Sequence, residues 1–235
     1  MKVVMIHGQN HKGSTYHIGR LLLEKVQGEK EVEEFFLPRD LNHFCTGCYA
    51  CITDDGKCPF YAEKSKIMEA VEHADLLIFT TPTYCMGASA SLKALFDLTF
   101  TYWMVHRPRA CMFHKKAVVI STAAGSGARK AVKDVANMLF YMGVPWVKRY
   151  GISVQAMNWE SVSAKRKEKI KKELTSLAAK LDRAGTPKAG IKTRAVFLLM
   201  RKMQQGGMGS SPVEMRYWSA QGWLDKKRPW KDGAE

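Results

Sequence analysis

Short apolar runs alternate with segments of helical periodicity over the first 155 residues. Two of the runs, residues 76–79 and 117–120, contain no polar residue, which is typical of strands buried on both faces of a parallel sheet. The alternation predicts an α/β fold with a doubly wound, five-stranded parallel sheet. The predicted strands are 2–7, 32–37, 75–80, 116–122 and 146–153, and the predicted helices are 16–26, 63–73, 89–100 and 129–142.

The remaining residues, 156–235, follow a different pattern. Residues 161–184 predict an amphipathic helix, because one apolar stripe runs opposite many lysines: Ile170, Leu174, Leu177, Ala178 and Leu181. A second helix is expected at 193–205, and an irregular tail containing Tyr217, Trp218, Trp223 and Trp230 follows. We therefore predict a doubly wound domain over residues 1–155 and a helical and irregular, basic C-terminal extension over 156–235.

The charge of the chain is uneven. The formal net charge is +15, and residues 160–235 contain 18 Lys and Arg against 8 Asp and Glu. Such an extension could attract nucleic acid, anionic lipid or a phosphorylated cofactor or partner, or it could be a solvated helix face. No stretch of about 18 apolar residues predicts a membrane span, and the first residues do not resemble a signal peptide. We therefore expect a cytoplasmic location.

Three predicted loops follow strands at one edge of the sheet, where ligands bind in open α/β folds. The first, residues 8–15, opens a helix, so its backbone N–H groups and the helix dipole form a candidate phosphate site. The second, residues 80–87, presents a Pro-x-Tyr turn to a planar ligand, and the small third loop, residues 122–127, lets a flat ring approach the main chain. Neither a Walker A pattern nor Gly-x-Gly-x-x-Gly is present. Each loop alone also fits an ordinary turn or helix cap.

Four of the six cysteines lie within fourteen residues: Cys45, Cys48, Cys51 and Cys58. The two-residue gaps let three thiolates reach three corners of a cubane, and the longer loop that follows can return Cys58 as the fourth ligand. This spacing favours a [4Fe–4S] cluster. The alternatives are a zinc site, a thiol pair for disulfide exchange, and a ligand run without metal. Cys85 and Cys111 stand alone and are interpreted as buried thiols.

Taken in order, four segments resemble the NAD(P)H-dependent FMN reductase superfamily, whose fold is flavodoxin-like. They are Gly-Ser-Thr at 13–15, Thr-Pro-Thr-Tyr-Cys-Met-Gly at 81–87, Leu-Lys-Ala-Leu-Phe-Asp at 92–97 and Thr-Ala-Ala-Gly at 122–125. Within that superfamily, the cysteine run resembles the iron–sulfur flavoprotein branch.

The resemblance implies FMN as a cofactor and assigns its contacts. The FMN phosphate would be held by His11, Ser14 and Thr15. The ring and ribityl chain would contact Pro82, Thr83, Tyr84, Met86 and Gly87 on one side and Thr122, Ala123 and Gly125 on the other. Two segments depart from the family pattern: Gly8-Gln9-Asn10-His11 replaces Gly-Ser-Pro-Arg, which supplies weaker phosphate partners, and Ala62-Glu63-Lys64 replaces an acidic Asp-Asp-Met.

The predicted function is an FMN-dependent oxidoreductase. Electrons would pass from NAD(P)H or a ferredoxin-like donor through FMN and the [4Fe–4S] cluster to an acceptor that the sequence does not identify. Because the cofactor carries hydride transfer, no catalytic side chain is assigned. The aromatic segment 100–108 would either cover a ring-shaped substrate or pack against a second subunit, and we expect a homodimer or higher homo-oligomer.

Two alternative functions are considered. One is a cluster-free FMN reductase for quinones or nitroaromatics. The other is a basic protein that binds nucleic acid or a membrane surface through residues 160–235. Against the second, no nucleic-acid motif is recognised, and Phe197, Leu198 and Leu199 are expected to pack at a dimer interface or on the core.

Overall fold

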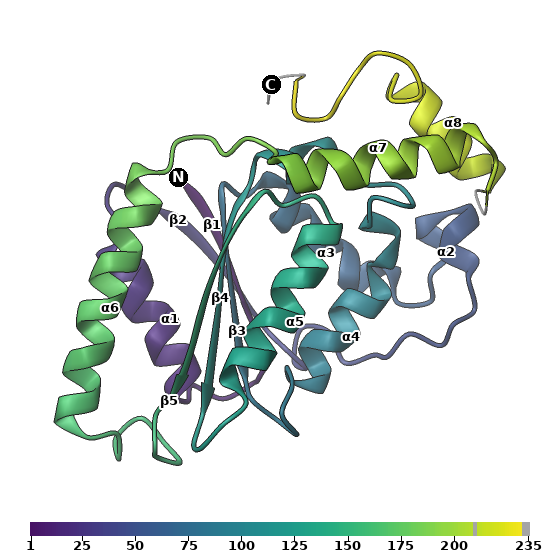
Figure 1. Ribbon diagram of the computed structural model, residues 1–235. Coiled ribbons are helices and arrows are strands. Elements are labelled where there is room, and N and C mark those ends of the chain that lie inside the picture. The colour runs from purple at the N-terminus through teal and green to yellow at the C-terminus, as the bar shows by residue number, and fades with distance from the viewer. Residues whose placement is uncertain (209–210, 232–235) are drawn as a thin grey trace.

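The computed structural model describes residues 1–208 and 211–231 (Figure 1). Five strands form one parallel sheet in the order β2-β1-β3-β4-β5, which is the strand order of the flavodoxin-like fold. The strands are β1 (Lys2–His7), β2 (Glu31–Phe36), β3 (Leu76–Pro82), β4 (Lys116–Ala123) and β5 (Trp146–Ser153). The predicted fold class is therefore confirmed.

Helices cover both faces of the sheet. Figure 1 shows α1 (Ser14–Lys25) and α6 (Ala164–Arg183) on one side, and α3 (Tyr61–His73), α4 (Ala90–Leu98) and α5 (Ala128–Tyr141) on the other. Successive residues of β1 divide between the two layers. Val3 and Met5 pack with α1 and α6, whereas Val4 and Ile6 pack with α3, α4 and α5. This burial on both faces explains the continuous apolar runs of the central strands.

The ends of several elements differ from the prediction in a way that matters for the ligand loops. The pairing of β3 with β4 continues to Pro82 opposite Thr122, and β4 ends at Ala123, so these three residues lie in strands. Helix α1 begins at Ser14, two residues before the predicted start, which brings Ser14 and Thr15 into its first turn. Parallel pairing and burial of the helix start extend these elements beyond the apolar runs.

The cysteine segment leaves the edge strand β2 and runs along the sheet face that carries α3 and α4 (Figure 1). It contains two short helical turns, α2 (Ala50–Thr53) and the 3₁₀ turn η1 (Asp55–Lys57). Cys51 belongs to α2, and Cys58 follows η1 directly. Two more 3₁₀ turns, η2 (Phe100–Tyr102) and η3 (Ala110–His114), flank the aromatic segment between α4 and β4.

The C-terminal extension continues after α6 with α7 (Ile191–Gln205) and α8 (Pro212–Ala220). The prediction of a wholly irregular tail was wrong, because α8 forms there. Ser211 and Glu214 make a reciprocal capping box, and Pro212 occupies the first helical turn, so the start of α8 is strongly specified. Within the described residues, no helix has the length and apolar character needed to cross a membrane.

A separate aromatic core joins this extension to the sheet domain. Trp218 and Trp223 are almost fully buried around Phe197, whose ring stacks on Trp218. Phe113 of η3 meets Phe197 edge-on, so the extension packs against the segment that leads into β4. Of the three α7 residues expected to pack, only Phe197 is buried, whereas Leu198 and Leu199 remain 39% and 55% exposed.

Candidate functional site

The three loops predicted to bind a ligand meet at the carboxyl edge of the sheet. Thr15 and Thr122 share a buried hydrogen bond of 2.6 Å between their hydroxyl groups, which ties the first loop to the third. The Thr83 backbone N–H donates to the Thr122 carbonyl at 2.9 Å, and the Gly8 N–H donates to the Thr80 carbonyl at 2.7 Å. These hydrogen bonds bring the three predicted ligand loops together at the carboxyl edge of the sheet.

The first loop leaves donors at the start of α1 without side-chain partners. The N-cap residue is Gly13, which has no side chain to accept from the first turn of the helix. Gln9 is 5% exposed, and neither atom of its amide has a hydrogen-bond partner. A buried, unpaired amide is unfavourable by about 1–3 kcal/mol. The free N–H groups at a helix start bind anions, so this loop has the features of an anion-binding cradle. His11 is exposed beside Gly13, while Ser14 and Thr15 are buried.

His7 is the last residue of β1 and directly precedes the first loop. The sequence analysis assigned it only to a strand. Its two ring nitrogens lie 2.8 Å from the Thr80 hydroxyl and 2.9 Å from the Glu34 carboxylate. Burial lowers the pKa of His7, against the opposing effect of Glu34. This side chain therefore fixes the end of β1 to both neighbouring strands.

The second loop contains a tight turn from Tyr84 to Gly87. These residues exchange two backbone hydrogen bonds of 3.1 and 3.0 Å, and the central residues Cys85 and Met86 have φ of 47° and 63°. A turn with two left-handed central residues normally favours Asn and Gly, so the backbone is strained here. Tyr84 and Met86 are 51% and 53% exposed. Cys85 is exposed as well, which corrects its interpretation as a buried thiol, because the turn directs it outward.

The third loop packs directly on the second. Gly127 has a φ of 97°, and a Cβ there would lie 2.8 Å from Thr83 Cγ2 and 3.1 Å from Met86 Sδ. Nothing lies within 4 Å of an added Cβ at Gly125, so that part of the loop is open. Ala123 is buried and can meet a ligand mainly through its backbone.

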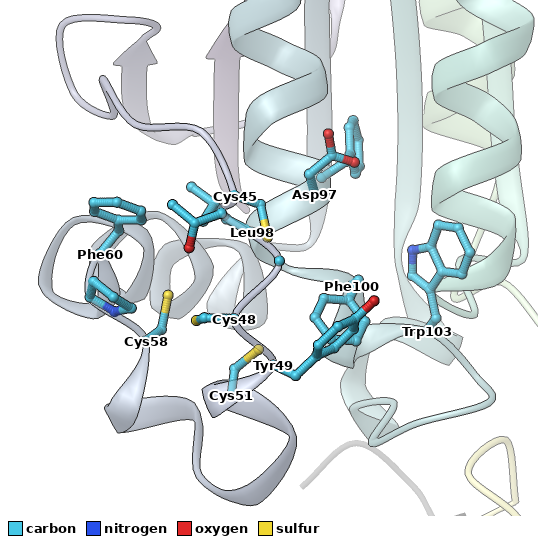
Figure 2. Close-up of a pocket in the computed structure, with 14 residues that line it drawn as sticks. Cys45, Cys48, Tyr49, Cys51, Cys58, Phe60, Asp97, Leu98, Phe100 and Trp103 are labelled. Atoms are coloured by element: carbon cyan, nitrogen blue, oxygen red, sulfur yellow. The ribbon is translucent and has the colours of Figure 1, made fainter. Parts of the chain in front are cut away.

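The four clustered cysteines border one cavity of about 360 Å³, shown in Figure 2. Cys45 and Cys48 are exposed, whereas Cys51 and Cys58 are buried. The remaining wall comes from the end of α4 and from aromatic side chains: Tyr49, Phe60, Phe96, Phe100 and Trp103. The predicted return of Cys58 to the other three cysteines is therefore present in the fold.

Four thiols border this cavity, and four thiolates are the donor set of a [4Fe–4S] cluster. Among the described residues, no three His, Cys, Asp or Glu side chains are gathered closely enough to hold one metal ion. A cubane takes one thiolate at each of its four iron corners, whereas zinc draws its ligands around a single ion.

The environments of the cysteines differ. The backbone N–H of Ala50 and the hydroxyl of Thr46 lower the pKa of the exposed Cys48 thiol. Burial raises the pKa of Cys51. Burial likewise raises the pKa of Cys111, which is only partly exposed and lies away from this cavity, so its interpretation as an ordinary thiol agrees with its surroundings.

Arg107 holds the cysteine segment in place and was missed by the sequence analysis. Its guanidinium donates to the backbone carbonyls of Cys51 and Ile52, the latter at 2.6 Å, and lies 3.3 Å from Asp55. Thr101 also donates to Asp55, at 3.0 Å. Because main-chain carbonyls have no sequence signature, no motif could have identified this role.

Helix α4 connects the two sites. It begins just after the second loop, and its last residues border the cysteine cavity. A helix of 9 residues rises about 13 Å. The loop cradle and the cysteine cavity are thus separate sites at opposite ends of one short helix.

Residues 1–158 match the family model described as NADPH-dependent FMN reductase. The chain belongs to this family. It is therefore an FMN-dependent NAD(P)H oxidoreductase, as the three loops and their motifs predicted. The residues that match the family model end before α6, α7 and α8 begin.

Relatives with iron–sulfur names also match this reductase. An iron–sulfur flavoprotein of Methanocaldococcus jannaschii is 29% identical over 145 residues, which is 58% of this chain and 70% of that protein. An iron–sulfur flavoprotein of Archaeoglobus fulgidus is 26% identical over 127 residues, which is 53% of this chain and 56% of that protein. The match thus spans little more than half the length of the second relative.

Solved structures share the fold. An FMN-dependent NADH-azoreductase from Bacillus anthracis, solved with FMN, superposes with a TM-score of 0.59 at 12% identity, covering 78% of this chain and all of the other. An NAD(P)H:quinone oxidoreductase from Methanothermobacter marburgensis gives a TM-score of 0.59 at 18% identity, covering 80% and 98%. At these identities the likeness concerns the fold alone.

Proposed function

We propose that this reductase passes electrons from NAD(P)H or a ferredoxin-like donor, through FMN and a [4Fe–4S] cluster, to a small-molecule or protein acceptor. The observation that carries the proposal is the gathering of Cys45, Cys48, Cys51 and Cys58 around one cavity in a chain of the FMN reductase family. The names of the archaeal relatives support it.

FMN, when bound, accepts a hydride and releases electrons singly, and the protein supplies orientation and electrostatics. In the proposed complex, the first turn of α1 binds the phosphate with backbone N–H groups and with the hydroxyls of Ser14 and Thr15. The exposed His11 lies at the rim, and the buried Gln9 amide gains the partner that it otherwise lacks. These residues fit an anion.

The second and third loops would hold the flavin ring and ribityl chain. The turn at residues 84–87 offers exposed side chains and backbone groups, and the backbone around Gly125 has open space beside it. The proposed contacts are those of the sequence prediction: Pro82, Thr83, Tyr84, Met86, Gly87, Thr122, Ala123 and Gly125.

In the cysteine cavity, the four thiolates are the proposed cluster ligands. Phe60, Phe100 and neighbouring apolar side chains pack around the buried Cys51 and Cys58, whereas Cys45 and Cys48 are exposed. Solvent access influences the reduction potential of an iron–sulfur centre. Helix α4, about 13 Å long, separates the flavin loops from the cysteine cavity. We expect electrons to pass over this distance without the movement of a domain.

The proposal is tested on protein purified anaerobically. We expect roughly one FMN and four irons per chain, with acid-labile sulfide matching the iron. Cys58→Ser should lower the iron content sharply and leave the FMN content unchanged, because Cys58 lines the cysteine cavity and not the flavin loops. Cys111→Ser is the matched control and should keep both.

Two outcomes would overturn parts of this proposal. Bound FMN with no iron after reconstitution would favour the cluster-free quinone or nitroaromatic reductase. One zinc per chain without labile sulfide would assign the cysteines to a structural metal instead.

A further inference from the structure

Three hydrogen bonds from the C-terminal extension hold the backbone of residues 105–108. The Gln204 side chain donates to the Val105 carbonyl at 2.8 Å, the Trp218 indole donates to the His106 carbonyl at 2.6 Å, and the Tyr217 hydroxyl donates to the Pro108 carbonyl at 2.6 Å. Gln204 and Trp218 are 1% and 0% exposed, so these bonds are shielded from water. The extension therefore fixes the backbone on both sides of Arg107.

A fourth hydrogen bond holds the same segment. The Glu214 carboxylate lies 2.6 Å from His106 Nδ1, and its other oxygen accepts from the Ser211 backbone N–H at 3.0 Å. The side chain that caps α8 thus also contacts residue 106. Helix α8 packs beside α2, so the extension borders the cysteine segment itself.

The Arg107 side chain makes its own contacts with the cysteine segment. Its side chain is 6% exposed and reaches the Cys51 and Ile52 carbonyls at the end of α2. Asp55, in the loop between Cys51 and Cys58, receives Arg107, Arg109 and Thr101. A buried guanidinium shared among carbonyls and a carboxylate fixes the start and the middle of that loop, since charge-assisted hydrogen bonds are the stronger kind.

We propose that the C-terminal extension is a clamp that positions Arg107, and that Arg107 in turn holds Cys51 and the Cys51–Cys58 loop in the geometry that receives the metal cluster. Arg107 is a positioning residue that touches no ligand sulfur. The metal-binding part rests on the proposed function, whereas the positioning part concerns the protein alone. Neither the family model nor the cysteine spacing assigns a role to this extension.

The positioning part is tested on metal-free, full-length protein by the alkylation rate of Cys51. This thiol is 7% exposed, so iodoacetamide reaches it only when the segment opens locally. Arg107→Met should raise the rate by on the order of tenfold or more, and Arg107→Lys, which keeps one charged donor, should give a smaller increase. The exposed Cys85, which lies in the second loop outside the cysteine segment, serves as the internal reference whose rate stays constant.

The clamp is tested separately by Trp218→Phe. This change keeps an aromatic ring and removes the indole donor to His106, so we expect Cys51 alkylation to rise several-fold. Trp223→Phe is the matched control, because Trp223 is 1% exposed in the same aromatic cluster and donates no hydrogen bond to residues 105–108 in the described chain. An equal effect of both changes would mean general loosening of the core and would refute the clamp.

Iron binding then links the clamp to the site. After anaerobic reconstitution, Arg107→Met and Trp218→Phe should hold less iron than the unaltered protein at equal FMN content. If the unaltered protein takes up no iron, the proposed function fails, while the alkylation rates still decide the positioning role. Unchanged alkylation and unchanged iron in both variants would overturn the inference.

Discussion

Thr15 and Thr122, 107 residues apart in sequence, share one hydrogen bond of 2.6 Å at the carboxyl edge of the sheet. One hydroxyl comes from the first turn of α1 and the other from the end of β4. Their contact joins the proposed phosphate cradle to the loop proposed to face the flavin ring. The two parts of the FMN site are thereby held at a fixed separation.

Removing this bond should weaken FMN binding. Thr15→Val keeps the size of the side chain but removes one hydroxyl, and the loss of a buried hydrogen bond of ~1 kcal/mol raises the FMN dissociation constant roughly five- to tenfold. Flavin fluorescence titration of apoprotein measures the constant. Thr175→Val on the exposed face of α6 is the control and should leave it unchanged. Unaltered affinity in Thr15→Val would remove Thr15 from the site.

Gln9 should affect stability and binding in opposite directions. Its amide is buried without a partner, so Gln9→Met should stabilise the apoprotein by about 1 kcal/mol while weakening FMN binding. Denaturant unfolding and FMN titration give the two values. The exposed Gln27→Met provides the comparison and should change neither. A less stable apoprotein would show that the Gln9 amide already has a partner in solution.

The strained turn of the second loop should respond to residues that accept left-handed backbone. Replacing Cys85 by Asn and Met86 by Gly matches the turn type, and we expect the unfolding free energy of the apoprotein to rise by roughly 1–2 kcal/mol. Urea unfolding measures the gain. Met157→Gly, at an exposed position without a positive φ, should give no gain. A loss of stability in the double variant would show that Met86 packing outweighs the backbone strain.

The Glu214 carboxylate should make stability depend on acid pH. Burial alone would raise its pKa, but hydrogen bonds with His106 and the Ser211 N–H hold the pKa below the ordinary value of 4.5. A lowered native pKa contributes stability that is present above about pH 4.5 and is lost as pH falls through the native pKa. Glu214→Gln should therefore be destabilised at pH 7 by about 1–2 kcal/mol, with a smaller difference at pH 3.

Urea unfolding at pH 7, 5, 4 and 3 gives the required comparison. Exposed Glu168→Gln is the control, because its carboxylate has no such partners. A constant difference between Glu214→Gln and the unaltered protein across this range would contradict the assignment.

The architecture followed from sequence because the apolar runs are long and uninterrupted. Residues 76–79 and 117–120 became the centres of β3 and β4, and parallel strands necessarily bring their following loops to one edge. The meeting of Thr15 with Thr122 is a consequence of that edge. Its hydrogen bond depends on the start of α1 at Ser14, two residues before the predicted start, a boundary that apolar periodicity does not mark. Thr122 lay within the predicted strand 116–122.

The C-terminal extension and the contacts of Arg107 were less accessible to sequence reasoning. The Ser211 and Glu214 spacing is a capping signal that could have indicated α8. Arg107 has no comparable signal, since its partners are carbonyls supplied by the fold. The cysteine spacing predicted that Cys58 would return to the other three, whereas iron occupancy stays a prediction for measurement.

The hydrogen bonds from Gln204 and Trp218 to residues 105–108 also matter while the chain is being synthesised. The cysteines leave the ribosome before the residues that hold Arg107. A chain that stops before α8, or that is cut there by a protease, keeps all four thiols but lacks their support. We expect such a shortened chain to incorporate less metal than one that carries α7 and α8.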